Sequence, residues 1–408
     1  MLKGRLLVLT PRFPYPVIGG DRIRIQHLCK ALSREFELTL LSLCETREEM
    51  RLEPHDGLFK HIWRVHLPRW RSYLNTLRAL PGNRPLQLAY YHCPAFRERV
   101  EILLPYHDAV VAHLIRTGQY VLDASIPRVL EMTDAISLNY QRMRTTNGNH
   151  SWKKLVYSVE QKRLQRYETA IVKKFDRVWL TSQVDRRFVD PVEDCEIDVI
   201  PNGADLELLP YRPPQMSGNT IVFIGNMVSA QNQDACHYFI RNILPAVRAK
   251  APVVFRIAGN VTEPVRRSFA KYEGVELTGR LEHIFEGVDG AFCGVCPVRA
   301  AAGIQNKVLE YLALGLPCVT SSLGLGGIEA RPEREVLVYS DAATAADHIL
   351  RLYHDTELRM RLAEAGRDLV TRRYDWKNIY RSFVDSCLNA TSGHAQWVAA
   401  KRGISSAA

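Results

Sequence analysis

The stretch AAAGIQNKVLEYLALGLPCVTSS, residues 300–322, decides the fold. It begins with small residues, continues as an amphipathic helix, and ends in a Gly-Leu-Pro turn before a short apolar strand. Gly303, Lys307 and Glu310 are spaced i, i+4 and i+7, so they share one helix face. Free amides and the dipole at a helix N-terminus attract phosphate, and a carboxylate further on accepts ribose hydroxyls. The pattern indicates a site for a phosphorylated ligand with a diol, although an ordinary surface helix has the same local composition.

Length and composition indicate a globular protein of two domains. The chain has 408 residues, of which 46% are hydrophobic and 24% charged, and one core rarely serves so long a chain. No apolar run reaches the roughly 18 residues of a membrane span, and the N-terminus lacks a signal-peptide pattern. We therefore expect a cytoplasmic protein.

The nine cysteines are scattered, which is typical of free thiols in a reducing compartment. Cys293 and Cys296 form a C-x-x-C pair inside an apolar run, with no second pair at zinc-finger spacing. We interpret them as two thiols of the core, with redox or metal chemistry as the alternative.

Apolar, β-rich runs alternate with helical segments in both halves of the chain. The runs lie at residues 5–10, 36–43, 61–67, 108–114, 128–134 and 176–182, and again at 220–227, 253–260, 274–280, 290–298, 317–322 and 335–341. Such alternation predicts parallel sheets covered on both faces, an α/β fold that binds ligands at the carboxyl ends of its strands. His113 follows one strand, and Gly19 and Gly20 lie in the loop between the first strand and the first helix.

The predicted domain boundaries follow from this alternation. We expect an N-terminal domain over residues 1–205, a Pro- and Gly-rich linker over 206–219 and a C-terminal domain over 220–373. A helix over 374–390 and a flexible tail over 391–408 would complete the chain.

The first half of the chain is basic. Residues 1–200 hold 31 Lys and Arg against 23 Asp and Glu, so most of the net charge of +10 lies there. The long helix predicted over residues 151–175 has an apolar stripe and a face rich in Lys and Arg. An anionic membrane surface is one expected partner and a merely solvated face the alternative, whereas no nucleic-acid-binding module is recognisable.

Several motifs together resemble the retaining family-4 glycosyltransferases of GT-B fold. They are IPNGAD at 200–205, IVFIGNM at 221–227, IAGN at 257–260, LTGR at 277–280 and GIQNKVLEYLALGLPCVTS at 303–321. The GIQNKVLE segment is similar to that of the bacterial exopolysaccharide subgroup. The resemblance spans about residues 1–390. It implies two Rossmann-like doubly wound domains facing a cleft, with a C-terminal helix crossing back to the first.

The resemblance also implies roles for individual residues. Glu310 matches the ribose-binding glutamate, and Gly303 and Ile304 match the helix start that faces the diphosphate. The remaining residues expected to bind the donor are Gly19, Gly20, Gly225, Asn226, Gly279, Arg280, Leu281 and Gln305. The expected catalytic residues are His113, Arg299 and Lys307.

Two departures from the family pattern concern charge. Ala302 stands where a second glutamate is common, and Asn226 and Gln231 stand where basic phosphate clamps are common. Arg299 and Lys307, near the same helix start, could supply those cations. Without a cation the leaving diphosphate would be poorly stabilised.

These observations predict a retaining glycosyltransferase that uses a nucleotide-sugar donor. Its acceptor would be a glycan or a lipid-linked hydroxyl in exopolysaccharide synthesis, at the inner face of the plasma membrane. No D-x-D motif follows a strand where one is expected, so we expect no metal or other cofactor. A sugar-nucleotide epimerase and a non-catalytic glycosyltransferase-like subunit stay open as alternatives.

Overall fold

The chain forms two compact units. The computed structural model describes residues 3–17, 19–145, 151–213 and 218–401. One unit holds Met1–Arg144, Gly148–Ile200 and the segment from Tyr380 onward, and the other holds Pro201–Ile379 with Thr145–Asn147. The first unit thus ends five residues before the boundary expected at 205, and the described part of the expected linker, residues 206–213, belongs to the second unit.

The first unit is built on a parallel sheet of seven strands in the order β3-β2-β1-β4-β5-β6-β7. The strands are β1 (Arg5–Thr10), β2 (Glu37–Cys44), β3 (His61–His66), β4 (Ala109–His113), β5 (Arg128–Thr133), β6 (Arg177–Leu180) and β7 (Ile197–Val199). β1 lies near the middle of the sheet, where Leu6, Leu7, Val8 and Leu9 are fully buried. A continuous apolar run is what a strand covered on both faces requires.

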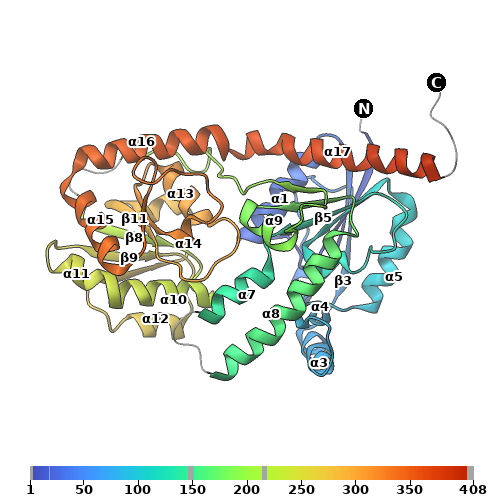
Figure 1. Ribbon diagram of the computed structural model, residues 1–408, viewed down its shortest axis with the longest axis horizontal. Coiled ribbons are helices and arrows are strands. Elements are labelled where there is room, and N and C mark those ends of the chain that lie inside the picture. The colour runs from blue at the N-terminus through green and yellow to red at the C-terminus, as the bar shows by residue number, and fades with distance from the viewer. Residues whose placement is uncertain (1–2, 18, 146–150, 214–217, 402–408) are drawn as a thin grey trace. The chain divides into compact units, whose positions relative to one another are not determined.

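α-Helices connect and cover these strands (Figure 1). They are α1 (Gly20–Leu32), α2 (Arg47–Arg51), α3 (Arg69–Ala79), α4 (Leu86–Tyr90), α5 (Pro94–Leu103), α6 (Leu114–Gly118), α7 (Ile136–Thr145), α8 (Ser151–Val172) and α9 (Gln183–Val189). A single 3-10 turn, η1 (Leu104–Tyr106), follows α5.

The second unit contains a parallel sheet of six strands in the order β10-β9-β8-β11-β12-β13. The strands are β8 (Thr220–Ile224), β9 (Val254–Ala258), β10 (Val275–Gly279), β11 (Ala291–Cys296), β12 (Cys318–Ser321) and β13 (Leu337–Tyr339). The α/β fold with two doubly wound parallel sheets is thus confirmed.

Helices lie on both faces of this second sheet as well (Figure 1). They are α10 (Ala230–Tyr238), the π-helix η2 (Phe239–Ile243), α11 (Leu244–Arg248), α12 (Glu263–Phe269), the 3-10 helix η3 (Ile284–Val288), α13 (Asn306–Leu314), α14 (Ser322–Leu325), α15 (Ala342–His354) and α16 (Thr356–Arg373). α13 packs on α16, and α11 packs on α15.

The C-terminal helix α17 (Trp376–Lys401) begins in the second unit and continues in the first. Within the first unit, the Nε1 of Trp179 donates to the Oγ of Ser386 at 2.7 Å, and the ring of Phe383 lies 5.2 Å from that of Trp179. The helix therefore returns to the first unit, as the resemblance implied. It extends to Lys401, whereas a flexible tail was expected from residue 391, and residues 402–408 lie outside the described part of the chain.

The C-x-x-C pair lies within β11, and both thiols are buried and free. Burial raises the pKa of the Cys293 thiol and of the Cys296 thiol. Gly294, between them, faces the ring of Tyr311, which a Cβ atom at this position would approach to 2.7 Å. The pair is therefore part of a packed strand, since a protonated buried thiol is inert.

In the described part of the chain, no helix is long and apolar enough to cross a membrane.

Candidate functional site

The carboxyl edge of the second sheet has a topological switch point. The chain proceeds from β8 to β9 and β10 on one side, and β11 and the later strands lie on the other side of β8. The loops after β8 and β11 therefore diverge, and an open parallel sheet binds its ligands in the crevice left there. The loop after β8 begins with Gly225 and Asn226, and the loop after β11 leads through Arg299 to α13.

Three glycine turns lie side by side along this edge. The Gly225 amide donates to the carbonyl of Ala258 at 2.9 Å, and the Gly259 amide donates to the carbonyl of Gly279 at 3.2 Å. A Cβ atom on Gly259, whose φ is +143°, would lie 2.3 Å from the Gly225 carbonyl oxygen. The close backbone approach requires glycine there. Gly225, Asn226 and Gly279, which are far apart in sequence, are thus gathered at one edge.

Tyr311 fixes α13 at this edge. The Tyr311 hydroxyl accepts from the amide of Ile224 at 2.8 Å and donates to the carbonyl of Val295 at 3.2 Å. One buried side chain therefore bonds the helix to both strands that flank the switch point. Gly315, in the left-handed region with φ 77°, ends the helix.

The N-terminal turn of α13 presents polar groups. The Gln305 side chain precedes the helix and accepts from the Lys307 ammonium at 3.3 Å. The ammonium also lies 5.3 Å from the centroid of the Phe223 ring, at the end of β8. Since Lys307 has no salt bridge to a described carboxylate, its charge is available to an anion near the helix start.

Glu310 lies one turn after Lys307 and is half-buried. Burial raises the pKa of Glu310 to about 7, and the nearby charge of Lys307 opposes that shift. A carboxylate held in a poorly solvated position gains from hydrogen-bond donors that a ligand brings. Two neighbouring hydroxyls of a ribose are donors of that kind.

Arg299 has a partner on α10. Its Nε lies 3.0 Å from Oδ2 of Asp234, and its Nη2 lies 2.5 Å from Oδ1 of the same carboxylate. The guanidinium also lies over the Tyr238 ring, with Cζ 5.0 Å from the centroid. The bidentate pair offsets the positive charge of Arg299. Lys307 is therefore the stronger candidate for binding an anion.

The structure places the other expected donor residues as follows. Gly303 has φ 64°, and its carbonyl oxygen would lie 2.7 Å from a Cβ atom on Gly326. Ile304 is buried, Arg280 is exposed beyond Gly279, and Leu281 packs against the core.

The positions that depart from the family pattern carry no charge in this chain. Ala302, at 7% exposure, is a buried alanine. The carbonyl of Asn226 accepts from the Asn232 side chain at 2.8 Å, and the Oδ1 of Asn226 accepts from the Val228 amide at 3.1 Å. Asn226 thus shapes its loop and supplies no charge, and Gln231 near the start of α10 is likewise neutral.

In the first unit, His113 belongs to a buried charged group at the end of β4. Its Nδ1 lies 2.5 Å from Oε2 of Glu131, and the Nε of Arg24 lies 2.6 Å from Oε1 of the same carboxylate. Burial alone would raise the pKa of Glu131, but the charges of Arg24 and His113 and their hydrogen bonds lower it to about 2. Because Glu131 is ionised, it fixes the proton of His113 on Nδ1, which leaves Nε2 as the other polar atom of the ring.

Backbone strain occurs next to this group. Leu114 directly follows His113, and Thr133 is the last residue of β5. Both residues have φ 65°. Such a conformation costs about 1–3 kcal/mol for residues with a Cβ and tends to occur at functional sites. Asp134 follows Thr133, and burial together with the nearby Asp185 raises its pKa to about 7.

Sequence reasoning missed Glu131 and Arg24. The signal was present in RVLEMT, where one glutamate interrupts an otherwise apolar strand. A charge at such a position requires a buried partner. The partner, 107 residues away on α1, could not be identified from spacing. Gly19, with φ 100°, precedes α1, and both Gly19 and Gly20 are exposed.

One group of described residues has the composition of a metal site. The ligand atoms of Asp190, Asp194 and Cys195 lie within 4.8 Å of one another. Both Asp190 oxygens accept loop amides, from Asp194 at 3.3 Å and from Cys195 at 3.0 Å, and Asp194 pairs with Lys173 at 2.9 Å. These carboxylates are accounted for by the loop that they hold together.

Comparison with known proteins shows what the second unit resembles. Residues 218–355 match the family described as glycosyl transferases group 1. A 44.6 kDa protein in the cps region of Klebsiella pneumoniae is 20% identical over 40% of this chain and 44% of its own length, so the match spans less than half of that relative. Glycogen synthase of Mycobacterium tuberculosis is 23% identical over 98% of this chain and 95% of its own length.

Solved structures resemble the whole chain. Sucrose-phosphate synthase from Thermosynechococcus elongatus has a TM-score of 0.71 at 17% identity, with 97% of this chain and 100% of that chain covered. HepE of Anabaena, solved with UDP and glucose, has a TM-score of 0.63 at 14% identity, with 94% and 99% covered. The chain has the GT-B fold, and residues 218–355 match the glycosyl transferases group 1 family, which supports a glycosyltransferase.

Proposed function

We propose that this protein is a retaining glycosyltransferase that moves a sugar from a nucleotide-diphosphate donor to an acceptor hydroxyl. The observation that carries the proposal is the N-terminal turn of α13, where Lys307 and Glu310 lie at a switch point bordered by the glycine turns of three strands. A cation, a helix N-terminus and a carboxylate one turn apart suit a diphosphate joined to a ribose.

The donor diphosphate binds at the start of α13 in this proposal. The helix dipole and Lys307 stabilise the charge that develops on the leaving phosphate. Gly225, Asn226 and Gly303 allow the phosphates to approach the backbone. Arg299 contributes less than Lys307 because Asp234 already offsets its charge.

Glu310 binds the ribose, and the loop around Gly279, Arg280 and Leu281 faces the base. Gly19, Gly20 and His113 are the candidates from the first unit, and Glu131 positions the imidazole of His113.

The chemical step needs no carboxylate nucleophile. The bond between the anomeric carbon and the diphosphate oxygen breaks through an oxocarbenium-like state, and the acceptor oxygen bonds to the same face. The acceptor proton passes to the leaving diphosphate. No metal takes part in this proposal.

The acceptor is a glycan or lipid-linked hydroxyl in the synthesis of a surface polysaccharide. Support comes from the similarity to a protein of a cps region, and the HepE complex with UDP-glucose makes uridine diphosphate sugars the first donors to test.

The test measures donor binding and transfer for the wild type and for Glu310→Ala. Thermal shift and calorimetry with UDP-, GDP- and ADP-sugars at pH 8, where Glu310 is ionised, should show one preferred donor. We expect Glu310→Ala to weaken its binding by about ten-fold to a hundred-fold, because the ribose hydroxyls lose a charged acceptor. Glu364→Ala, at an exposed position of α16, is the control.

Three outcomes would contradict parts of the proposal. Absence of binding to any nucleotide sugar would overturn the donor site. Binding without transfer to any glycan or lipid-linked acceptor would indicate a non-catalytic subunit. Transfer that EDTA abolishes and only Mg²⁺ or Mn²⁺ restores would overturn the metal-free mechanism.

A further inference from the structure

Helix α3 is an amphipathic helix turned outward. Of its residues from Arg69 to Ala79, Ser72 alone is buried. The large side chains at positions i, i+3, i+4, i+7 and i+10 from Trp70 form one apolar stripe that is exposed along its length. Those side chains are Trp70, Tyr73, Leu74, Leu77 and Leu80. Trp70 is 61% exposed and Leu77 is 62% exposed, so most of the stripe is open to solvent in the described part of the chain.

The polar side of α3 faces the protein. Ser72 is fully buried, and the Nδ2 of Asn75 donates to the carbonyl of His92 at 2.9 Å. An ordinary surface helix buries its apolar stripe and exposes its polar side. In α3 the orientation is reversed, so a row of aromatic and aliphatic side chains faces water. Burying these side chains against another apolar surface would be favourable.

Polar contacts with α8 hold the end of the stripe and the start of α4. The carboxylate of Glu160 accepts from the amide of Leu86 at 2.7 Å, and Arg163 donates to the carbonyl of Leu80 at 2.9 Å. Val156 and Val159 lie four residues before Glu160 and Arg163, on the same helix face, and both are exposed. The two hydrogen bonds thus tie α8 to the segment that follows α3.

The surface carries a consistent positive charge. Residues 69–86 contain Arg69, Arg71, Arg78 and Arg84 and no acidic residue. The guanidinium of Arg71 lies 5.2 Å from the centroid of the Trp70 ring, so charge and apolar stripe adjoin. Arg69 pairs with Glu45 at 2.9 Å, and Arg84 donates to Gln119, which leaves Arg71 and Arg78 as the cations best placed for an outside anion.

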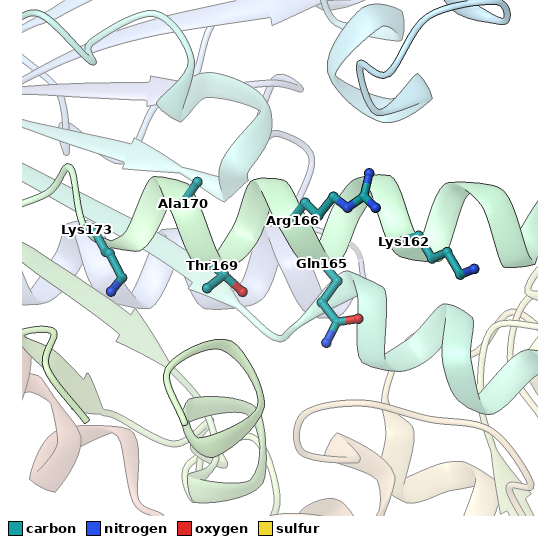
Figure 2. A pocket seen from close by; sticks show the side chains of 6 residues that line it. All are labelled: Lys162, Gln165, Arg166, Thr169, Ala170 and Lys173. Carbon is teal, nitrogen blue, oxygen red and sulfur yellow. The ribbon is translucent and has the colours of Figure 1, made fainter. Parts of the chain in front are cut away.

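A basic surface continues along α8. A shallow pocket of about 480 Å³ is lined by residues of that helix: Lys162, Gln165, Arg166, Thr169, Ala170 and Lys173. Figure 2 shows these side chains along α8. Lys162 and Arg166 are exposed and follow Val159 within two turns. Cations beside an apolar stripe with Trp and Tyr are the composition of a helix that lies in the interface of an anionic bilayer.

We propose that α3, assisted by the exposed part of α8, docks the first unit onto an anionic phospholipid surface. Trp70, Leu74 and Leu77 enter the boundary between headgroups and acyl chains, while Arg71 and Arg78 contact lipid phosphates. The proposal goes beyond the proposed function and does not depend on the donor or on the reaction.

Vesicle flotation with the full chain tests the proposal. We expect the wild type to float with vesicles of phosphatidylcholine mixed with phosphatidylglycerol, and to float less with phosphatidylcholine alone. Trp70→Ser combined with Leu77→Ser should lower the apparent affinity at least about ten-fold, since two exposed apolar anchors are lost. Val184→Ser combined with Val192→Ser, which removes two exposed apolar side chains elsewhere in the same unit, is the control and should bind as the wild type does.

A second pair of variants tests the charge. Arg71→Ser with Arg78→Ser should remove most of the preference for phosphatidylglycerol, whereas Arg372→Ser with Arg381→Ser removes the same charge from exposed sites and should not. Two results would overturn the proposal. One is equal flotation of the wild type and of the Trp70 and Leu77 variant. The other is a wild type that does not bind vesicles but forms a dimer in sedimentation, together with a Trp70 and Leu77 variant that is monomeric. A second copy of the chain would then cover the stripe.

Discussion

His113 shows how a single side chain gains its properties from distant residues. Its ring contacts Glu131, which also holds Arg24, and all three side chains are buried. Removing one partner of such a group leaves a charge without compensation in a poorly solvated place, which costs about 3–5 kcal/mol. The stability of the first unit and the orientation of His113 therefore depend on the same carboxylate.

The first prediction concerns Glu131 and acid. Its pKa of about 2 lies below the ordinary value of 4.5, so its stabilising effect is complete above about pH 4.5 and is lost as the pH falls toward 2. We expect Glu131→Gln to be about 3 kcal/mol less stable than the wild type at pH 7, and the difference to shrink between pH 4.5 and 2. Urea denaturation at several pH values measures this.

Glu101→Gln is the matched control for that experiment. Glu101 is an exposed residue of α5 in the same unit, and its substitution should leave the stability nearly unchanged at every pH. A difference between Glu131→Gln and the wild type that stays constant from pH 7 to pH 3 would contradict the role of the ionised carboxylate.

At the scale of the element, α13 and β11 are fitted to each other. Tyr311 places its ring against Gly294 and bonds through its hydroxyl to the backbone of both neighbouring strands. The position of the candidate site at the start of α13 thus depends on a glycine in the strand beneath it. The opposite case is α3, which is held by polar contacts and leaves its apolar stripe exposed.

The second prediction concerns Gly294→Ala. The added methyl group would lie 2.7 Å from the Tyr311 ring, so the helix or the ring must shift. We expect a loss of stability of about 1–3 kcal/mol and weaker nucleotide binding, because overpacking displaces α13. Gly82→Ala is the control, since its nearest atom would be the carbonyl oxygen of Ala79 at 3.7 Å. Equal stability of the two variants by thermal denaturation would contradict this packing argument.

At the scale of the whole molecule, chain order and spatial grouping differ. The segment from Tyr380 onward belongs with the first unit, although the whole second unit precedes it in sequence. Phe383 is fully buried between the Trp179 ring and the Arg24 guanidinium, whose Cζ lies 5.3 Å from the Phe383 centroid. The end of the chain therefore contributes to the core of its beginning.

The third prediction follows from this grouping. Phe383→Ala should destabilise the first unit by about 3–5 kcal/mol, because a large buried side chain is lost. Hydrogen exchange should then speed up in β6, at Arg177–Leu180, and not in β8, at Thr220–Ile224. Phe269→Ala, at an equally buried residue of the second unit, should speed up exchange in β8 and not in β6. Faster exchange in both strands for Phe383→Ala would contradict the assignment.

Sequence patterns predicted the strands well because a strand buried on both faces needs a continuous apolar run. β1 and β8 lie within their expected runs. Gly225 and Gly279, which the sequence singled out, both lie at the carboxyl edge of the second sheet. The patterns were less informative about α3, since a period of 3.6 reveals an apolar stripe but not whether it faces the core or the outside. They named Arg299 as a possible cation for the phosphates but could not show that the fold pairs its guanidinium with Asp234.

The sequence by itself determined the two alternating α/β halves, the glycine turns at strand ends and the polar start of α13, because these depend on neighbours within a few residues. Only the tertiary structure decided that Glu131 holds His113 with Arg24, that Asp234 offsets Arg299 and that the apolar stripe of α3 points outward. The physical reason is that each of these depends on burial and on partners that are distant in the chain. Local spacing carries no information about such contacts until the sheets and helices are packed.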